Sequence, residues 1–334
     1  MDNMTNILFQ NALLRQKQNI PPIWFMRQAG RYHSHYRGLK EKYTFEQLCK
    51  SPELAAEVAN GPINEFDFDV AILFSDILYV LEGLGLELKF DPGPKFSSYI
   101  NINNMKDYAN IDQALDHLKF QSDAIKITRE RISNSKSLIG FVGGPWTLVR
   151  YAFGKDKFII DNKVYFEFLN TTLVPLLKKN IQLQLDAGAE IVIIFDSSLY
   201  DLNAQDFEKD YLPLLDDISS SFPKKVGYYS RGKQEKEILP LMKFPFAGFG
   251  FDKSINLKNI FENSTHGFVQ GNFDEKLMLL NSDNFKNELI NYIEIMKSIE
   301  NKDGWVCGLG HGINKETPEK NVHLFIENIR KAFS

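Results

Sequence analysis

The sequence predicts an α/β protein built as a single-domain (β/α)8 TIM barrel with loop insertions, spanning residues 1–334. Eight short runs rich in β-branched or aromatic residues recur along the chain, and each is followed by a stretch of helical periodicity. Runs such as VAILF and IVIIF are hydrophobic throughout, as is typical of parallel strands covered on both faces. No Gly/Ser-rich linker divides the repeats, which favours one closed barrel.

The elements follow one another in a regular order. The eight predicted strands are Ile23–Arg27, Val70–Phe74, Leu138–Val142, Glu190–Asp196, Lys225–Ser230, Phe246–Phe251, His266–Gln270 and Trp305–Leu309. The best-signalled helix has Ser51 as its N-cap and Pro52 at its first position, and it continues through Asn60. The other predicted helices are Gln113–Ile132, Tyr165–Ala187, Asp206–Ser220, Ser282–Ile299 and Pro318–Ala332. An open Rossmann sheet would require G-x-G-x-x-G after an early strand, and the RQAGRY at the first strand lacks those glycines.

Composition and charge restrict the partners. The net charge of −4 combines 39 basic with 43 acidic side chains, and no block of like charge forms a nucleic-acid stripe. No stretch approaches the roughly 18–20 apolar residues of a membrane span, and the N-terminus has no apolar run of signal-peptide length. We therefore expect a cytoplasmic protein with neither nucleic-acid nor membrane partners. Cys49 and Cys307 are too few for a disulfide framework or a structural metal site.

Barrel enzymes carry their chemistry at the carboxyl ends of the strands and in the following loops. RQAGRY places Arg27 and Arg31 there, close enough for both guanidinium groups to face one cavity. The planar fork of arginine matches carboxylates, so this pair favours an anion site. The alternative is a pair of ordinary surface ion pairs, but the apolar PPIWFM before the arginines favours the anion site.

Asp76 follows the apolar run VAILFS, which would deliver a carboxylate into the mouth of the barrel. The alternative is an N-cap for a helix that starts near Ile77, since aspartate is favoured at that position and Ser75 is a weaker candidate. The spacing does not decide between the two interpretations.

GGPWTLVRYAF follows the third strand, and its glycines would let the backbone approach a ligand closely. Trp146 and Tyr151 could form the wall of a pocket for a flat organic molecule, although aromatic side chains are more often part of a core. Tyr151 is the better candidate because a buried hydroxyl needs a partner. Asp196 and Ser197 end the fourth strand and could hydrogen-bond in the same pocket.

His311 lies in GLGHGI, directly after the eighth strand. A lone histidine is more often structural, but at a strand end its ordinary pKa near ~6.5 makes it a candidate proton donor or carboxylate partner. His33 and His35, in the loop after Arg31, are expected to be solvated.

In the motifs that contain these residues, the chain resembles the uroporphyrinogen decarboxylase family, and the resemblance runs from about Asn11 to the C-terminus. The segments that carry the resemblance are PPIWFMRQAGRY, ILFSDIL, GGPWTL followed by a tyrosine, FDS, HGFVQGN and GLGHGI. The resemblance implies substrate binding by Arg27, Gln28, Ala29, Gly30, Arg31, Asp76, Tyr151, Ser197 and His311. It implies catalytic roles for Asp76, Arg27, Tyr151 and His311. The loop HSHYRGLK departs from the usual leucine-proline-glutamate-tyrosine run of the family.

The resemblance further implies a homodimer without metal or organic cofactor, which converts uroporphyrinogen III to coproporphyrinogen III in haem biosynthesis. In such a reaction the pyrrole itself can accept the electrons left behind by carbon dioxide. Asp76 would face the pyrrole N–H groups and stabilise the transient cation, while the arginines pair with the acid arms. The first proton could come from Tyr151, His311 or a water held by Arg27.

Two other functions need different residues. A zinc methyltransferase of the same superfamily would use a His-x-Cys pair with a further cysteine, and no His-x-Cys occurs here. A non-catalytic tetrapyrrole carrier would keep the arginines and lose Asp76 or Tyr151, and both are present. Decarboxylation is therefore the function that the sequence favours.

Overall fold

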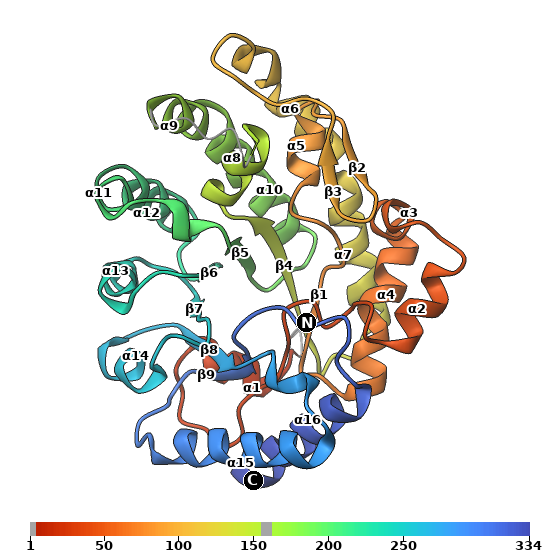
Figure 1. Cartoon of the computed structure of the whole chain (residues 1–334), viewed down its shortest axis with the longest axis vertical. Coiled ribbons are helices and arrows are strands. Elements are labelled where there is room, and N and C mark those ends of the chain that lie inside the picture. The colour runs from red at the N-terminus through yellow and green to blue at the C-terminus, as the bar shows by residue number, and fades with distance from the viewer. Residues whose placement is uncertain (1–4, 155–161) are drawn as a thin grey trace.

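The computed structural model describes residues 5–154 and 162–334, and its centre is a curled parallel sheet (Figure 1). Seven strands are ordered β1-β4-β5-β6-β7-β8-β9, and every neighbouring pair is parallel. The strands are β1 (Val70–Ile72), β4 (Ser137–Gly143), β5 (Val192–Asp196), β6 (Val226–Ser230), β7 (Gly248–Gly250), β8 (Phe268–Phe273) and β9 (Trp305–Leu309). Seven of the eight predicted strands thus correspond to observed ones, and the mixed α/β architecture with a parallel sheet is confirmed.

The remaining predicted strand, Ile23–Arg27, was wrong in extent. Only Ile23 forms a bridge, in parallel with Cys307 of β9, and the N–H of Asp69 donates to the carbonyl of Ile23 at 3.0 Å. This short segment therefore contacts both β9 and the residue that precedes β1. The extended backbone ends at Arg27, whose φ of 63° lies in the left-handed region. Because few residues other than glycine adopt that conformation, a strand cannot continue through it.

Helices cover the outer face of the sheet, and Figure 1 shows α10, α12, α13 and α14 arranged around it. The helices are α1 (Ile7–Leu13), α2 (Ser34–Lys40), α3 (Phe45–Lys50), α4 (Pro52–Phe66), α5 (Tyr79–Gly83), α6 (Ile111–His117), α7 (Lys119–Arg131), α8 (Pro145–Ala152), α9 (Lys163–Phe168), α10 (Val174–Asp186), α11 (Ala204–Asp206), α12 (Leu212–Ser221), α13 (Glu235–Ile238), α14 (Leu257–Asn263), α15 (Ser282–Ser298) and α16 (Glu319–Phe333). The predicted helix Gln113–Ile132 is in fact two helices, α6 and α7. Two other predicted helices each contain a π-helical turn, Leu169–Leu173 and Phe207–Tyr211.

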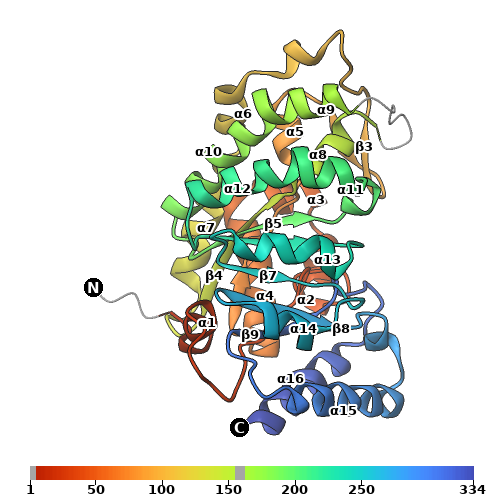
Figure 2. The ribbon, with the colours of Figure 1, turned by 90° about the vertical axis from the view of Figure 1, so that its left-hand side faces the viewer.

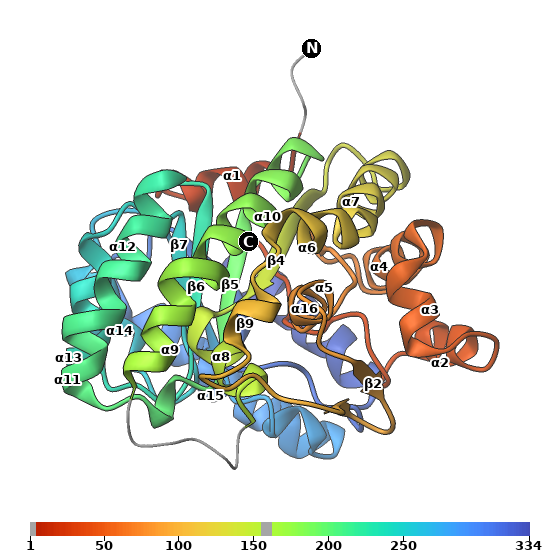
Figure 3. The same cartoon turned by 90° about the horizontal axis from the view of Figure 1, so that it is seen from above.

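The two ends of the strands are covered by different elements. Figures 2 and 3 show α1 on one side of the molecule and the antiparallel hairpin of β2 (Leu88–Phe90) and β3 (Pro94–Phe96) on the opposite side. The amide of Gln10 on α1 donates to Glu190, just before β5, so α1 covers the amino ends. The ring of Phe96 on β3 contacts Tyr151, which follows the carboxyl end of β4. The hairpin therefore borders the carboxyl ends, where the site is expected.

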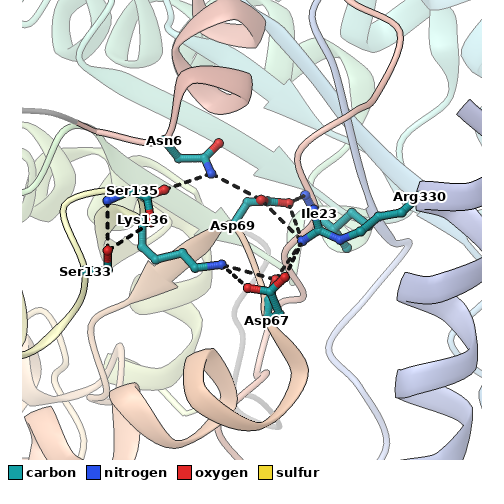
Figure 4. Close-up of polar contacts among 8 residues, drawn as sticks. All are labelled: Asn6, Ile23, Asp67, Asp69, Ser133, Ser135, Lys136 and Arg330. Atoms are coloured by element: carbon teal, nitrogen blue, oxygen red, sulfur yellow. Dashed lines mark hydrogen bonds and ion pairs between the residues drawn. The ribbon is translucent and has the colours of Figure 1, made fainter. Parts of the chain in front are cut away.

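A polar cluster at the amino ends fixes the first segment of the chain to the sheet (Figure 4). Asp69 is 3% exposed, and it accepts hydrogen bonds from the backbone N–H of Ile23 at 2.8 Å and the amide of Asn6 at 3.2 Å. The guanidinium group of Arg330 on α16 lies 3.4 Å from the same carboxylate. One buried acid thus joins α1, the Ile23 segment, β1 and α16.

Within the described ranges, no helix is long and apolar enough to cross a membrane. Cys49 and Cys307 are both buried and free. His33 contradicts its prediction as a solvated residue, because it is 1% exposed and its ring lies 4.9 Å from that of Phe66. It precedes α2, which is formed by most of the divergent loop HSHYRGLK.

Candidate active site

The side chain of Arg27 lies against the loop that follows β9. A Cβ atom added to Gly312 would come within 2.5 Å of the Arg27 Cδ, so glycine at this position leaves room for the arginine. His311 is the preceding residue, and burial together with the charges of Arg27 and Arg231 lowers the pKa of its imidazole to about 3. The structure therefore brings Arg27 and His311, which are far apart in the sequence, into one neighbourhood.

Three arginines at the carboxyl ends are exposed, namely Arg27, Arg31 and Arg231. None of the three makes an ion pair with an acid in the described ranges, in contrast to the alternative of ordinary surface ion pairs. Unpaired guanidinium groups are available to an anionic ligand, and arginine binds carboxylates with two parallel hydrogen bonds. Arg231 was missing from the predicted site, although it directly follows the predicted strand that ends at Ser230.

Asp76 is not a helix N-cap, because Leu78 takes that position in α5 and no side chain caps the helix. The Oδ1 of Asp76 accepts a hydrogen bond from the backbone N–H of Leu78 at 2.9 Å, and α5 begins one residue later, at Tyr79 rather than near Ile77. Its Oδ2 receives no hydrogen bond from a described residue. Burial raises the pKa of Asp76 to about 6, and the N–H of Leu78 and the charge of Arg27 oppose that rise. One oxygen of the carboxylate thus stabilises a local turn, and the other can still accept a hydrogen bond from a ligand.

His311 is held by Tyr229 on β6. The Tyr229 hydroxyl lies 3.0 Å from Nδ1 of His311 and 2.9 Å from the carbonyl of Gly310, and the two rings stack with centroids 6.1 Å apart. A hydroxyl has one hydrogen, so both contacts are hydrogen bonds when Nδ1–H donates to Tyr229 and Tyr229 donates to Gly310. Nε2 then carries a lone pair. With its pKa lowered to about 3, the imidazole is neutral near pH 7, which disfavours an imidazolium donor in the free protein.

The segment Gln28–Gly30 supports Arg27. The side chain of Gln28 is buried, and it accepts from the N–H of Phe25 at 3.1 Å while donating to the carbonyl of Val70 at 2.9 Å. Its amide therefore ties the loop to β1 and is not free for a ligand. Ala29 and Gly30 are half-buried beside it.

Tyr151 and Ser197 are the other predicted site residues. Tyr151 is half-buried near the end of α8, and its ring lies 6.4 Å from that of Phe96 on the hairpin. Ser197 is half-buried directly after β5. Ser197 thus lies at the carboxyl end of β5, and Tyr151 lies in the last turn of the helix that follows β4.

Asp196 does not hydrogen-bond into the pocket, as its place at a strand end had suggested it could, and Trp146 lies in the core, which was the alternative to a pocket wall. Asp196 is fully buried, and its carboxylate accepts from the N–H and hydroxyl of Thr147 at 2.9 and 2.7 Å and from the hydroxyls of Tyr228 and Tyr211. Trp146 packs on Tyr211, with ring centroids 6.2 Å apart. Because its acceptors are filled by the protein, Asp196 anchors the start of α8 to β5.

Cys307 is fully buried in β9, and in the described part of the chain no three histidine, cysteine, aspartate or glutamate side chains gather closely enough to hold a metal ion.

Solved structures resemble this fold at low sequence identity. A methyltransferase from Methanosarcina mazei matches with a TM-score of 0.79 at 18% identity, covering 98% of each chain. A B12-independent methionine synthase from Shewanella sp. W3-18-1 matches with a TM-score of 0.56 at 10% identity, covering 84% of this chain and 88% of that one. At such identities the likeness concerns the fold alone.

Sequence relatives are more informative. A protein from Neorickettsia sennetsu named uroporphyrinogen decarboxylase is 34% identical over 92% of this chain and 96% of its own length. One of the same name from Orientia tsutsugamushi is 33% identical over 97% of this chain and 98% of its own length. The family model described as uroporphyrinogen decarboxylase (URO-D) matches residues 4–332. The chain therefore belongs to the uroporphyrinogen decarboxylase family.

Proposed function

We propose that this protein is a carboxy-lyase that decarboxylates the acetate arms of uroporphyrinogen III to methyl groups, giving coproporphyrinogen III in porphyrin and haem biosynthesis. The observation that carries the proposal is the combination of three guanidinium groups with one carboxylate, Asp76. The guanidinium groups make no ion pair with a described residue, and Oδ2 of Asp76 accepts no hydrogen bond from one. A macrocycle with carboxylate arms and central pyrrole N–H groups is complementary to such a site. Membership of the family supports the same substrate.

The chemistry needs no external electron acceptor. A proton adds to the ring carbon next to the pyrrole carbon that bears the arm, and the ring becomes cationic. The bond to the carboxylate then breaks, its electron pair neutralises the ring, and carbon dioxide leaves an exocyclic methylene. A second proton converts the methylene to methyl, and the ring carbon returns the first proton. The net change is one proton taken up for each carbon dioxide released.

Asp76 is the group that stabilises the cationic ring, through its charge and through hydrogen bonds from the pyrrole N–H groups. Arg27 and Arg31 bind acid arms, and Tyr151, Ser197 and His311 make the remaining polar contacts. The neutral state of His311 supports a role as carboxylate partner more than as first proton donor. Tyr151 and a water held by Arg27 then remain as donors. The backbone of Gln28, Ala29 and Gly30 shapes the arginine loop.

We also propose a domain organisation, a cellular location and an oligomeric state for the chain. Residues 1–334 would form one domain, a closed (β/α)8 barrel in which the Ile23 segment takes the eighth position, supported by its contacts with β9 and Asp69. The enzyme would act in the cytoplasm as a homodimer, without metal or organic cofactor. Sedimentation at micromolar concentration tests the dimer, and a single species of monomer mass would contradict it.

Incubation with chemically reduced uroporphyrinogen III in the absence of air tests the reaction. We expect mass spectrometry of the oxidised products to show successive losses of carbon dioxide, ending at coproporphyrin. Prior treatment with a chelator should leave the rate unchanged. Recovery of the substrate mass alone would contradict decarboxylation and would instead fit a tetrapyrrole carrier.

A further inference from the structure

A chain of buried amide side chains leads from the core of the protein to the residue beside Asp76. The amide nitrogen of Gln121 on α7 donates to the hydroxyl of Ser75 at 2.9 Å, and its oxygen accepts from Asn180 on α10 at 3.2 Å. The oxygen of Asn180 accepts from Gln184, one turn further along α10, at 3.3 Å. Gln121 and Asn180 are each 3% exposed and Gln184 is fully buried. Such groups are costly to bury unless their partners are in place.

The far end of this chain has a structural explanation. β1 ends at Ile72, so the backbone of Phe141 in β4 has no strand partner on that side. The Gln184 amide accepts from the N–H of Phe141 and donates to its carbonyl, both at 2.9 Å. A Cβ atom at Gly140 would come within 2.1 Å of the Gln184 oxygen, so glycine makes room for this amide. The Gln184 amide thus takes the place of a neighbouring strand for the backbone of Phe141.

The near end has no such explanation, because Gln121 bonds to a serine hydroxyl rather than to backbone. A small cavity lies there, with about 10 Å³ of room, lined by Asp76, Gln121 and Asn180 together with apolar side chains of β4, α5 and α10. That room is close to the minimum of about 10–15 Å³ that one water needs, and a buried water also needs two to four polar partners. Each of the two amide nitrogens has a second N–H beyond the one used in the chain.

We propose that Gln121 is a positioning residue for Asp76. Together with Asn180 it holds one water in this cavity, and the water donates a hydrogen bond to the Asp76 carboxylate. Its bond to Ser75 fixes the turn that carries the carboxylate. The arrangement keeps Asp76 ionised and directed toward the ligand. The inference deepens the proposed function, since it rests on the role of Asp76 in turnover.

The variant Gln121→Leu removes the side-chain amide, both its N–H donors and its oxygen, while keeping most of the volume. Without these donors the carboxylate loses stabilisation of its charged form, so the pKa of Asp76 rises. We expect a carbon-13 NMR titration of labelled aspartate, assigned by comparison with Asp76→Asn, to show that rise. This readout does not depend on turnover, so it separates failure of the inference from failure of the proposed function. An unchanged titration in Gln121→Leu would overturn the inference.

Two further variants distinguish a positioning role of Gln121 from a purely structural one. Gln121→Glu keeps the side-chain length and adds a negative charge beside Asp76, so it should raise the pKa of that carboxyl further than leucine does. Asn321→Leu is the matched control, because Asn321 is also a buried amide, which donates to the carbonyls of Met278 and Leu280. It should lower stability and leave the titration of Asp76 unchanged. Equal titrations in all three variants would contradict the positioning role.

Kinetics and crystallography complete the test. Misplacement of a reacting group by about 1 Å can cost about 10²-fold in rate, so kcat of Gln121→Leu should fall by about tenfold or more with KM little changed. A high-resolution crystal structure of the unsubstituted protein should show one water within hydrogen-bond distance of Asp76, Gln121 and Asn180. An empty cavity would overturn the proposal.

Discussion

The two acids that flank β1 lie at opposite ends of the same short strand and have opposite surroundings. Asp69, just before the strand, is bound by the backbone of Ile23, the amide of Asn6 and the guanidinium group of Arg330. Asp76, just after it, receives one hydrogen bond, from the N–H of Leu78. Burial raises the pKa of both carboxyls, so burial alone does not distinguish them.

What distinguishes them is the origin of their partners. The acceptors of Asp69 are filled by three segments of the chain, so its charge contributes to holding the fold together. Burial also raises the pKa of Asp76, but much of the acceptor capacity of this carboxylate is unused by the described residues, as is common at functional sites. The strand β1 thus has a structural acid at its amino end and, beyond its carboxyl end, an acid with acceptor capacity that the described residues do not use.

The largest effect expected from this comparison is on the rate. Asp76→Asn keeps the shape and the bond from Leu78 but removes the charge that stabilises a cationic ring. Loss of one such electrostatic group typically costs ~10²–10³ in rate, so kcat should fall by that factor while much of the binding remains. Anaerobic assays of kcat and KM measure it. A variant that turns over at the original rate would remove Asp76 from the chemistry.

Arg27→Ala tests whether Arg27 binds the substrate and whether its charge lowers the pKa of Asp76. A hydrogen bond to a charged group contributes about 1.5–3 kcal/mol, so kcat/KM should fall about 10- to 100-fold through both binding and rate. Asp76 must be ionised to act, so activity falls as the pH drops below its pKa of about 6. Loss of the Arg27 charge raises the pKa of Asp76 further. The acid limb of the pH profile of kcat/KM, where activity falls at low pH, should therefore move to higher pH.

The matched control for this variant is Arg131→Ala. Arg131 is also exposed, but it pairs with Glu57 and ends α7, ahead of the amino end of β4. This variant should keep both the rate and the position of the acid limb. An acid limb that stays in place in Arg27→Ala would mean that Arg27 and Asp76 do not interact.

Asp69→Asn should lower the stability and leave kcat unchanged, which is the reverse of what we expect for Asp76→Asn. The amide offers one acceptor oxygen, and its NH2 would face donors from Ile23 or Arg330. Leaving buried groups unsatisfied costs about 1–3 kcal/mol, so unfolding in denaturant should shift to lower concentration with an unchanged slope. The folded fraction should retain its kcat. If kcat fell as far as in Asp76→Asn, the separation between structural and catalytic ends of β1 would fail.

The sequence predicted most of the sheet and the polar residues that follow its strands, because each strand carries its own hydrophobic signal and its own polar end. It could not separate Asp76 from Asp196, since both follow apolar strands. The difference comes from Tyr211 and Tyr228, distant in the sequence, whose hydroxyls fill the Asp196 acceptors. Likewise, the left-handed turn at Arg27 leaves no mark in the hydrophobic pattern. Tertiary partners, rather than local propensity, decided these positions.

The smallest effect concerns His311, and it sharpens the assignment of the acid limb to Asp76. A group with its pKa near 3 does not change its charge between about pH 5 and 8, the window in which histidine usually titrates. His311→Gln retains a donor for the hydroxyl of Tyr229, so the loop should keep its place. We therefore expect the acid limb of kcat/KM to stay where it is and the rate to fall only modestly. If the limb disappears in His311→Gln, the imidazole is the titrating group, and the ionisation that controls activity belongs to the loop after β9 and not to β1.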